Sequence, residues 1–120
     1  MNADIALKSE VRIDDFLDMH PNLFIIFGYF CFYAKSVHLP VLVTSMFSDP
    51  VEGRISRAHE TGRAIDLSIR GWPVDKINTV VAFVEGKCSY LGAIGKDGKR
   101  RALIVHDSGS GQHFHAQCAA

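Results

Sequence analysis

The apolar segment from Leu23 to Ala34 constrains the fold of this chain more than any other feature. It is shorter than the ~20 apolar residues that a helix needs to cross a bilayer, and Lys35 and His38 follow it at once. Its aromatic and β-branched residues leave a strand possible, but its length favours a helix. Because the segment is apolar nearly all round, we expect a central helix over about Leu23 to Val37 and no membrane span.

Proline residues bound this helix on both sides. Pro21 disfavours helical geometry at His20, and Asn22 is expected to cap the helix that follows. The sequence His38-Leu39-Pro40 ends it. A shorter helix is predicted before it, from Val11 to Met19, where apolar residues are interleaved with carboxylates.

A third helix is predicted after Pro73, which suits a first helical turn. Gly86 is expected to end this helix. Its apolar residues recur at helical spacing: Val74, Ile77, Val80, Val81 and Val84.

The other regular segments read as strands: Val41–Ser45, Ala64–Ile69, Tyr90–Ile94, Arg101–His106 and His113–Gln117. The turn Gly95-Lys96-Asp97-Gly98 has hairpin chemistry, whereas Ser48 to Gly62 and Ser108 to Gly111 read as loops. No internal repeat or low-complexity linker divides the chain, so residues 1–120 are expected to form one domain. The order of elements predicts an α+β fold, in which the N-terminal helices and one further helix pack on a mostly antiparallel sheet.

Composition excludes several classes of protein. Lys and Arg total 13, as do Asp and Glu, so no basic excess favours nucleic acid or a membrane surface as a partner. Three cysteines without a CxxC pair predict reduced thiols, with Cys31 and Cys88 in the core, and no cysteine-type zinc site. The residues from Met1 to Val11 lack the features of a secretory signal. The sequence leaves the oligomeric state open.

Two histidine-containing clusters can carry chemistry. In Gln112-His113-Phe114-His115, strand alternation would place both histidines on one face and Phe114 in the core. Two adjacent imidazoles suit a metal ligand beside a proton-transfer group, although a pair of surface histidines is the plainer interpretation.

The second cluster runs from His59 to Asp66, with Gly62 permitting a tight turn between them. His59, Asp66 and a strand histidine make a nitrogen and oxygen ligand set that suits zinc with a fourth position for water. The plainer interpretation of Asp66 is a solvated strand residue, but its apolar neighbours make this less attractive. The helical His-Glu-x-x-His motif is absent, because Arg63 stands at its second histidine position.

The pattern His59-x-x-Gly62-x-Ala64-x-Asp66, followed later by His113-x-His115, resembles the D-alanyl-D-alanine carboxypeptidase type of peptidoglycan metallopeptidase. That group includes phage endolysins that cut between L-alanine and D-glutamate, and it belongs to a wider set with lysostaphin-like enzymes and the hedgehog signalling domain. The apolar helix, the segment Pro40 to Ser45 and Gly71-Trp72 add to the resemblance, which covers about Asp14 to Gln117.

The resemblance implies a hedgehog/D-Ala-D-Ala-peptidase-like fold and a zinc ion held by His59, Asp66 and His115. It also implies that His113 transfers a proton or holds the oxyanion. The expected substrate is a peptidoglycan peptide, met by a phage or prophage protein that stays in the host cytoplasm or virion before it reaches the cell wall.

Two departures from the family pattern concern catalysis. Gln112 stands where many members place a glutamate base, and an amide cannot take that proton, so His113 is expected to substitute, with Glu60 a weaker candidate. The arginine that usually follows the Thr44-Ser45 strand is missing. Arg54 and Arg57 are the candidate replacements, although solvated loop cations are an equally good interpretation of both.

Two alternatives stay open on the sequence alone. One is a non-catalytic zinc-containing structural or cell-wall-binding module of the same fold. The other is a metal-dependent hydrolase that acts on another bond. The sequence does not say which peptide bond would be cut.

Overall fold

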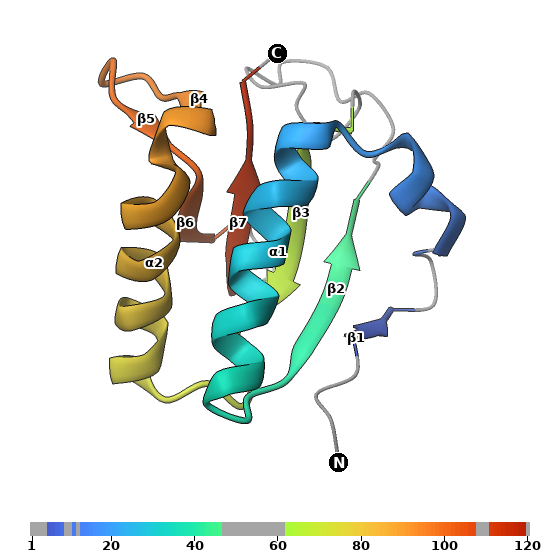
Figure 1. The fold of residues 1–120 in the computed structure, drawn as a ribbon. Helices are drawn as coiled ribbons and strands as arrows, with labels where there is room; N and C mark the ends of the chain where they lie inside the picture. The colour runs from blue at the N-terminus through green and yellow to red at the C-terminus, as the bar shows by residue number, and fades with distance from the viewer. Residues whose placement is uncertain (1–4, 9–10, 12, 47–61, 108–110, 120) are drawn as a thin grey trace.

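The computed structural model describes residues 5–8, 11, 13–46, 62–107 and 111–119 (Figure 1). In this part of the chain, helices α1 (Pro21–Ser36) and α2 (Val74–Cys88) lie side by side on one face of a five-stranded sheet. The predicted α+β architecture with a mostly antiparallel sheet is therefore confirmed. A 3-10 helix, η1 (Ile13–Asp18), stands where the short N-terminal helix was predicted.

The sheet has the strand order β1-β2-β3-β7-β6. Its members are β1 (Ile5–Leu7), β2 (Val41–Ser45), β3 (Ala64–Ser68), β7 (Gln112–Gln117) and β6 (Leu103–Asp107). All neighbours are antiparallel except β1 and β2. The edge strand β1 was not predicted, because three residues in a mixed, charged segment carry no readable alternation. β3 and β7 occupy the middle of the sheet, and both carry predicted site residues.

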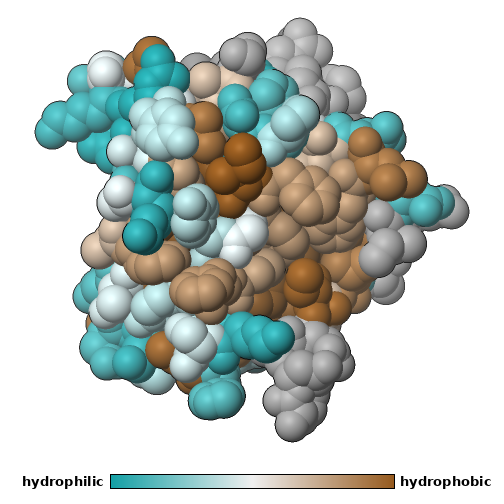
Figure 2. All heavy atoms as spheres, viewed as in Figure 1, coloured by the Kyte–Doolittle hydropathy of each residue, from teal (hydrophilic) through white to brown (hydrophobic). Residues whose placement is uncertain are grey.

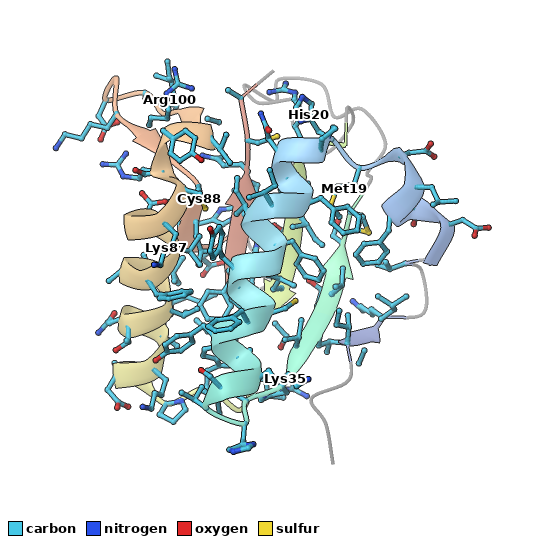
Figure 3. The ribbon with its side chains drawn as sticks, viewed as in Figure 1. Met19, His20, Lys35, Lys87, Cys88 and Arg100 are labelled. Carbon is cyan, nitrogen blue, oxygen red and sulfur yellow. The ribbon has the colours of Figure 1, made fainter. Side chains whose placement is uncertain are left out.

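Helix α1 begins two residues earlier than expected. Its N-cap is His20, whose Nδ1 accepts a hydrogen bond from the Asn22 backbone N–H at 3.1 Å, and Pro21 occupies the first turn (Figure 3). The prediction that Asn22 caps the helix is therefore wrong. The imidazole nitrogen accepts the hydrogen bond that a short polar side chain usually accepts at an N-cap. Proline has no backbone N–H that would need an acceptor in the first turn.

Helix α1 is buried on one side only. Leu23, Ile26 and Phe30 are completely buried, but Phe24 and Phe32 are 51% and 67% exposed. Figure 2 shows hydrophobic side chains gathered on the face of the molecule on which the helices lie. The expectation of a helix enclosed on all sides is wrong, because the sheet and α2 cover only its inner face. No helix in the described ranges is long and apolar enough to cross a membrane.

Three aromatic rings form the centre of the core between α1 and the sheet. Phe30 lies 5.3 Å from Trp72 and 5.0 Å from Phe114, and Trp72 lies 5.1 Å from Phe114, measured between ring centroids. The indole Nε1 of Trp72 donates a hydrogen bond to the Pro40 carbonyl at 2.9 Å. Phe114 is fully buried, as strand alternation predicted. Its ring fixes which face of β7 points away from the helices.

Helix α2 and the following hairpin differ from their predicted bounds. Gly86 lies inside α2, which continues to the buried Cys88 (Figure 3), so the predicted end at Gly86 is wrong. The predicted strand Tyr90–Ile94 is a 3-10 turn, η2 (Ser89–Leu91), followed by the short strand β4 (Ala93–Ile94). β4 pairs with β5 (Arg100–Arg101) across the predicted turn.

The bend from η2 into β4 depends on Gly92. A Cβ atom there would lie 2.1 Å from the Arg101 carbonyl carbon, so no larger residue fits without backbone movement. This close approach requires glycine at position 92.

All three cysteines are free. Cys88 and Cys118 are fully buried, whereas Cys31, predicted to lie in the core, is partly buried at its edge. Burial raises the pKa of the Cys31 thiol to about 12, and burial together with Glu85 raises that of Cys88 to about 11. These thiols are therefore protonated near neutral pH and behave as apolar side chains.

The Glu85 carboxylate joins α2 to the start of β6. Its Oε2 accepts hydrogen bonds from the backbone N–H groups of Ala102 at 2.5 Å and Leu103 at 3.0 Å. We expect Glu85→Ala to lower the free energy of unfolding by ~1–3 kcal/mol, because two backbone donors lose their acceptor. Urea denaturation measures this, with the exposed Asn78→Ala on the same helix as the control, expected to change stability by less than ~0.5 kcal/mol. Equal losses in both variants would contradict the assigned role.

Candidate metal centre

The register of three neighbouring strands assembles the site. Asp66 on β3 is directly opposite His115 on β7, and His113 on β7 is directly opposite His106 on β6. Directly opposite residues of antiparallel strands project to the same side of the sheet. Phe114 projects to the helices, so these four polar side chains share the other face.

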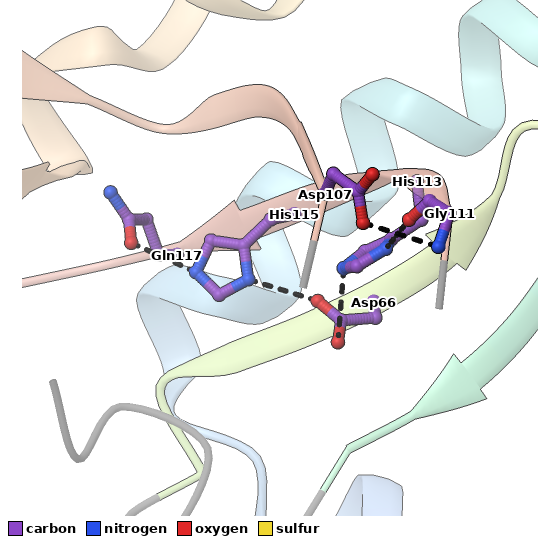
Figure 4. Close-up of polar contacts among 6 residues, drawn as sticks. All are labelled: Asp66, Asp107, Gly111, His113, His115 and Gln117. Atoms are coloured by element: carbon purple, nitrogen blue, oxygen red, sulfur yellow. Dashed lines mark hydrogen bonds and ion pairs between the residues drawn. The ribbon is translucent and has the colours of Figure 1, made fainter. Parts of the chain in front are cut away.

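The Asp66 carboxylate lies between two imidazoles (Figure 4). Its Oδ1 is 2.9 Å from His115 Nδ1, and its Oδ2 is 3.5 Å from His113 Nε2. The three side chains are only 16%, 10% and 12% exposed, in the order Asp66, His115 and His113. Solvent therefore screens the charge of this carboxylate less than it would on an open surface.

Each imidazole is oriented by a second polar contact. His115 Nε2 is 2.9 Å from Gln117 Oε1, and the Gln117 amide nitrogen donates to the Arg101 carbonyl at 3.5 Å. His113 Nδ1 is 3.3 Å from the Gly111 carbonyl oxygen. Each imidazole therefore has one nitrogen that faces Asp66 and another that faces a carbonyl oxygen.

In the tautomers that place each ring proton on the nitrogen facing a carbonyl oxygen, the two nitrogens that face Asp66 would carry lone pairs. His115 Nδ1 faces one carboxylate oxygen, and His113 Nε2, which is buried and makes no hydrogen bond to the described residues, faces the other. A lone pair and a carboxylate oxygen repel unless a proton or a cation lies between them. Neutral imidazole and carboxylate are also the ligands that zinc takes in catalytic sites. The donor set therefore fits a divalent metal.

His106 belongs to the same cluster and was not identified from the sequence. Its ring lies 4.4 Å from that of His113 and 4.6 Å from that of His115, between centroids. Ligand atoms of Asp66, His106 and His113 all lie within 4.8 Å of one another, so these three residues could hold a metal ion. Extending the pairing of β6 and β7 outward from their short loop would have placed His106 opposite His113, and that signal was available in the sequence.

The other predicted site residues divide into two groups. His59, Glu60, Arg54 and Arg57 lie outside the described residues. Gln112 is exposed at the start of β7, opposite Asp107 on β6, and strand alternation places it on the face opposite to His113. The structure thus brings together Asp66, His113 and His115.

Comparison of the chain with protein-family models, curated proteins and solved structures gave no match.

Proposed function

We propose that this protein is a zinc-dependent peptidase that hydrolyses peptide bonds in peptidoglycan stem peptides or cross-links. The single observation that carries the proposal is the placement of the Asp66 carboxylate between the imidazoles of His113 and His115 on one face of the sheet. The sequence pattern that ends at His115 supports the choice of peptidoglycan, and with it a hedgehog/D-Ala-D-Ala-peptidase-like fold. A phage or prophage cell-wall-degrading protein fits this activity.

The proposed zinc ligands are Asp66, His115 and His59. His115 would use Nδ1, which faces Asp66, because its Nε2 is within hydrogen-bond distance of Gln117. Zinc in such a site polarises a scissile carbonyl and lowers the pKa of water toward ~7. Asp66 supplies the negative charge that retains the cation, and Gln117 fixes the orientation of His115 in the manner of an outer-shell partner.

The proposed proton carrier is His113. Its Nδ1 is held by the Gly111 carbonyl, which leaves Nε2 directed at the carboxylate side of the site. From there Nε2 accepts a proton from the attacking water and returns it to the departing amine. Gln112 cannot take this role because an amide has no basic nitrogen.

The test is cleavage of peptidoglycan fragments, followed as new amino termini, with zinc content measured on the same samples. Chelation should remove activity and added zinc should restore it. His113→Ala should retain one equivalent of zinc while kcat falls by ~10²–10⁴-fold. His38→Asn is the matched control, because His38 is exposed, lies outside the cluster, and has a φ of 59°, which asparagine tolerates. Full activity in metal-stripped protein, or in His113→Ala, would sink the proposal.

The second candidate is a non-catalytic zinc module of the same fold. The observation that favours it is Gln112 at the position of the expected glutamate base. This candidate expects bound zinc and a large loss of thermal stability on chelation, but no cleavage of any peptidoglycan fragment by the zinc-loaded protein.

A further inference from the structure

We infer that the same face of the sheet binds a second divalent cation, held by Asp66, His106 and His113, and that this cation inhibits the enzyme. The binding stands on the geometry of the three side chains, and the inhibition rests on the proposed peptidase function. This site uses the histidine of β6, which the first ligand set does not include.

The spacing of the donors suits a cation. With metal–ligand bonds of ~2.1 Å, two donors of one tetrahedral zinc lie roughly 3.4 Å apart. His113 Nε2 and Asp66 Oδ2 are 3.5 Å apart, so a cation can take both with little movement. His106 supplies the third donor, because its ligand atom lies within 4.8 Å of theirs.

Asp66 can serve both cations because its two oxygens face different rings. Oδ1 faces His115 and Oδ2 faces His113, so the two ligand sets share this carboxylate alone. Paired metals held by protein ligands lie ~3.5–4 Å apart, a separation that a bridging carboxylate permits.

The second cation should bind more weakly than the first. Two divalent charges at this separation repel each other, and they share a single carboxylate of the described cluster. Binding also occupies the lone pair of His113 Nε2, the nitrogen that the proposed mechanism needs as a proton acceptor. Occupation of the second site therefore blocks proton transfer.

Equilibrium dialysis of the full chain against zinc, with metal analysis, tests the binding. Wild type should bind two equivalents, the second at least tenfold more weakly, and His106→Ala should bind only the first. His106→Gln is a second variant in case the alanine variant does not fold, since it keeps a polar side chain of similar reach. His38→Asn should bind two equivalents, which excludes loss of a surface histidine as the cause.

Activity against free zinc tests the inhibition. Wild-type activity should rise to one equivalent and fall beyond it, and in His106→Ala the inhibitory zinc concentration should increase at least tenfold, each protein being compared with its own maximum. Several outcomes overturn the inference: one equivalent in wild type, two undiminished equivalents in both His106 variants, or the loss of all zinc from them. Absence of cleavage at every zinc concentration refutes the peptidase and the inhibition, while the dialysis result still decides the second site.

Discussion

Asp66→Asn should reduce the affinity of the chain for zinc by at least ~100-fold and remove the peptidase activity. Loss of an outer-shell partner already costs 10–100-fold in metal affinity, and Asp66 is the carboxylate that faces both His113 and His115. The substitution keeps the shape of the side chain but removes the negative charge and one acceptor oxygen. Zinc affinity is measured by competition with a chelating indicator, alongside cleavage of peptidoglycan fragments.

Asp107→Asn is the matched control for this experiment. Asp107 is an exposed carboxylate at the end of β6, and its Oδ1 accepts a hydrogen bond from the Gly111 backbone N–H at 3.2 Å. The same chemical change is made there on β6, outside the proposed ligand sets. We expect zinc affinity within a few-fold of wild type. Wild-type affinity in Asp66→Asn would refute the assignment of Asp66, whereas equal losses in both variants would indicate a general charge effect.

Strand periodicity predicted on which face of the sheet the site residues lie, but not which residues of the neighbouring strands they pair with. The alternation in His113-Phe114-His115 correctly placed Phe114 in the core and both histidines on the opposite face of β7. His115 and Asp66 are 49 positions apart in the sequence, and their pairing depends on the register between β3 and β7. No local sequence pattern encodes that register. The family resemblance, rather than periodicity, associated these two residues.

The errors in the predicted fold have local physical causes. Helix α1 was expected to be enclosed because its composition is apolar on every side, but burial depends on how many neighbouring elements there are, and only one side of α1 is covered. Gly86 was expected to stop α2, but the buried Val84 and Cys88 anchor the last turn on either side of it. Packing of the flanking residues outweighs the helix penalty of glycine, which is only ~1 kcal/mol.

Phe114→Ala should lower the free energy of unfolding by ~3–5 kcal/mol, as for other buried phenylalanines. The ring is fully buried and touches Phe30 and Trp72, with centroids 5.0 and 5.1 Å away. Its removal leaves a cavity at the point where α1, β7 and the Trp72 segment meet. Urea denaturation followed by circular dichroism measures the loss.

Phe32→Ala supplies the control, because Phe32 lies on the outer face of α1 and is 67% exposed. The same atoms are deleted, but the Phe32 side chain buries little surface when the chain folds. We therefore expect the free energy of unfolding to change by less than ~1 kcal/mol. A loss of stability in Phe114→Ala no larger than in Phe32→Ala would refute the central role of this ring.

Phe114→Leu, which fills part of the cavity, extends the test to the metal centre. Because Phe114 lies between His113 and His115 on β7, loosening its packing should weaken zinc binding in a variant that still folds.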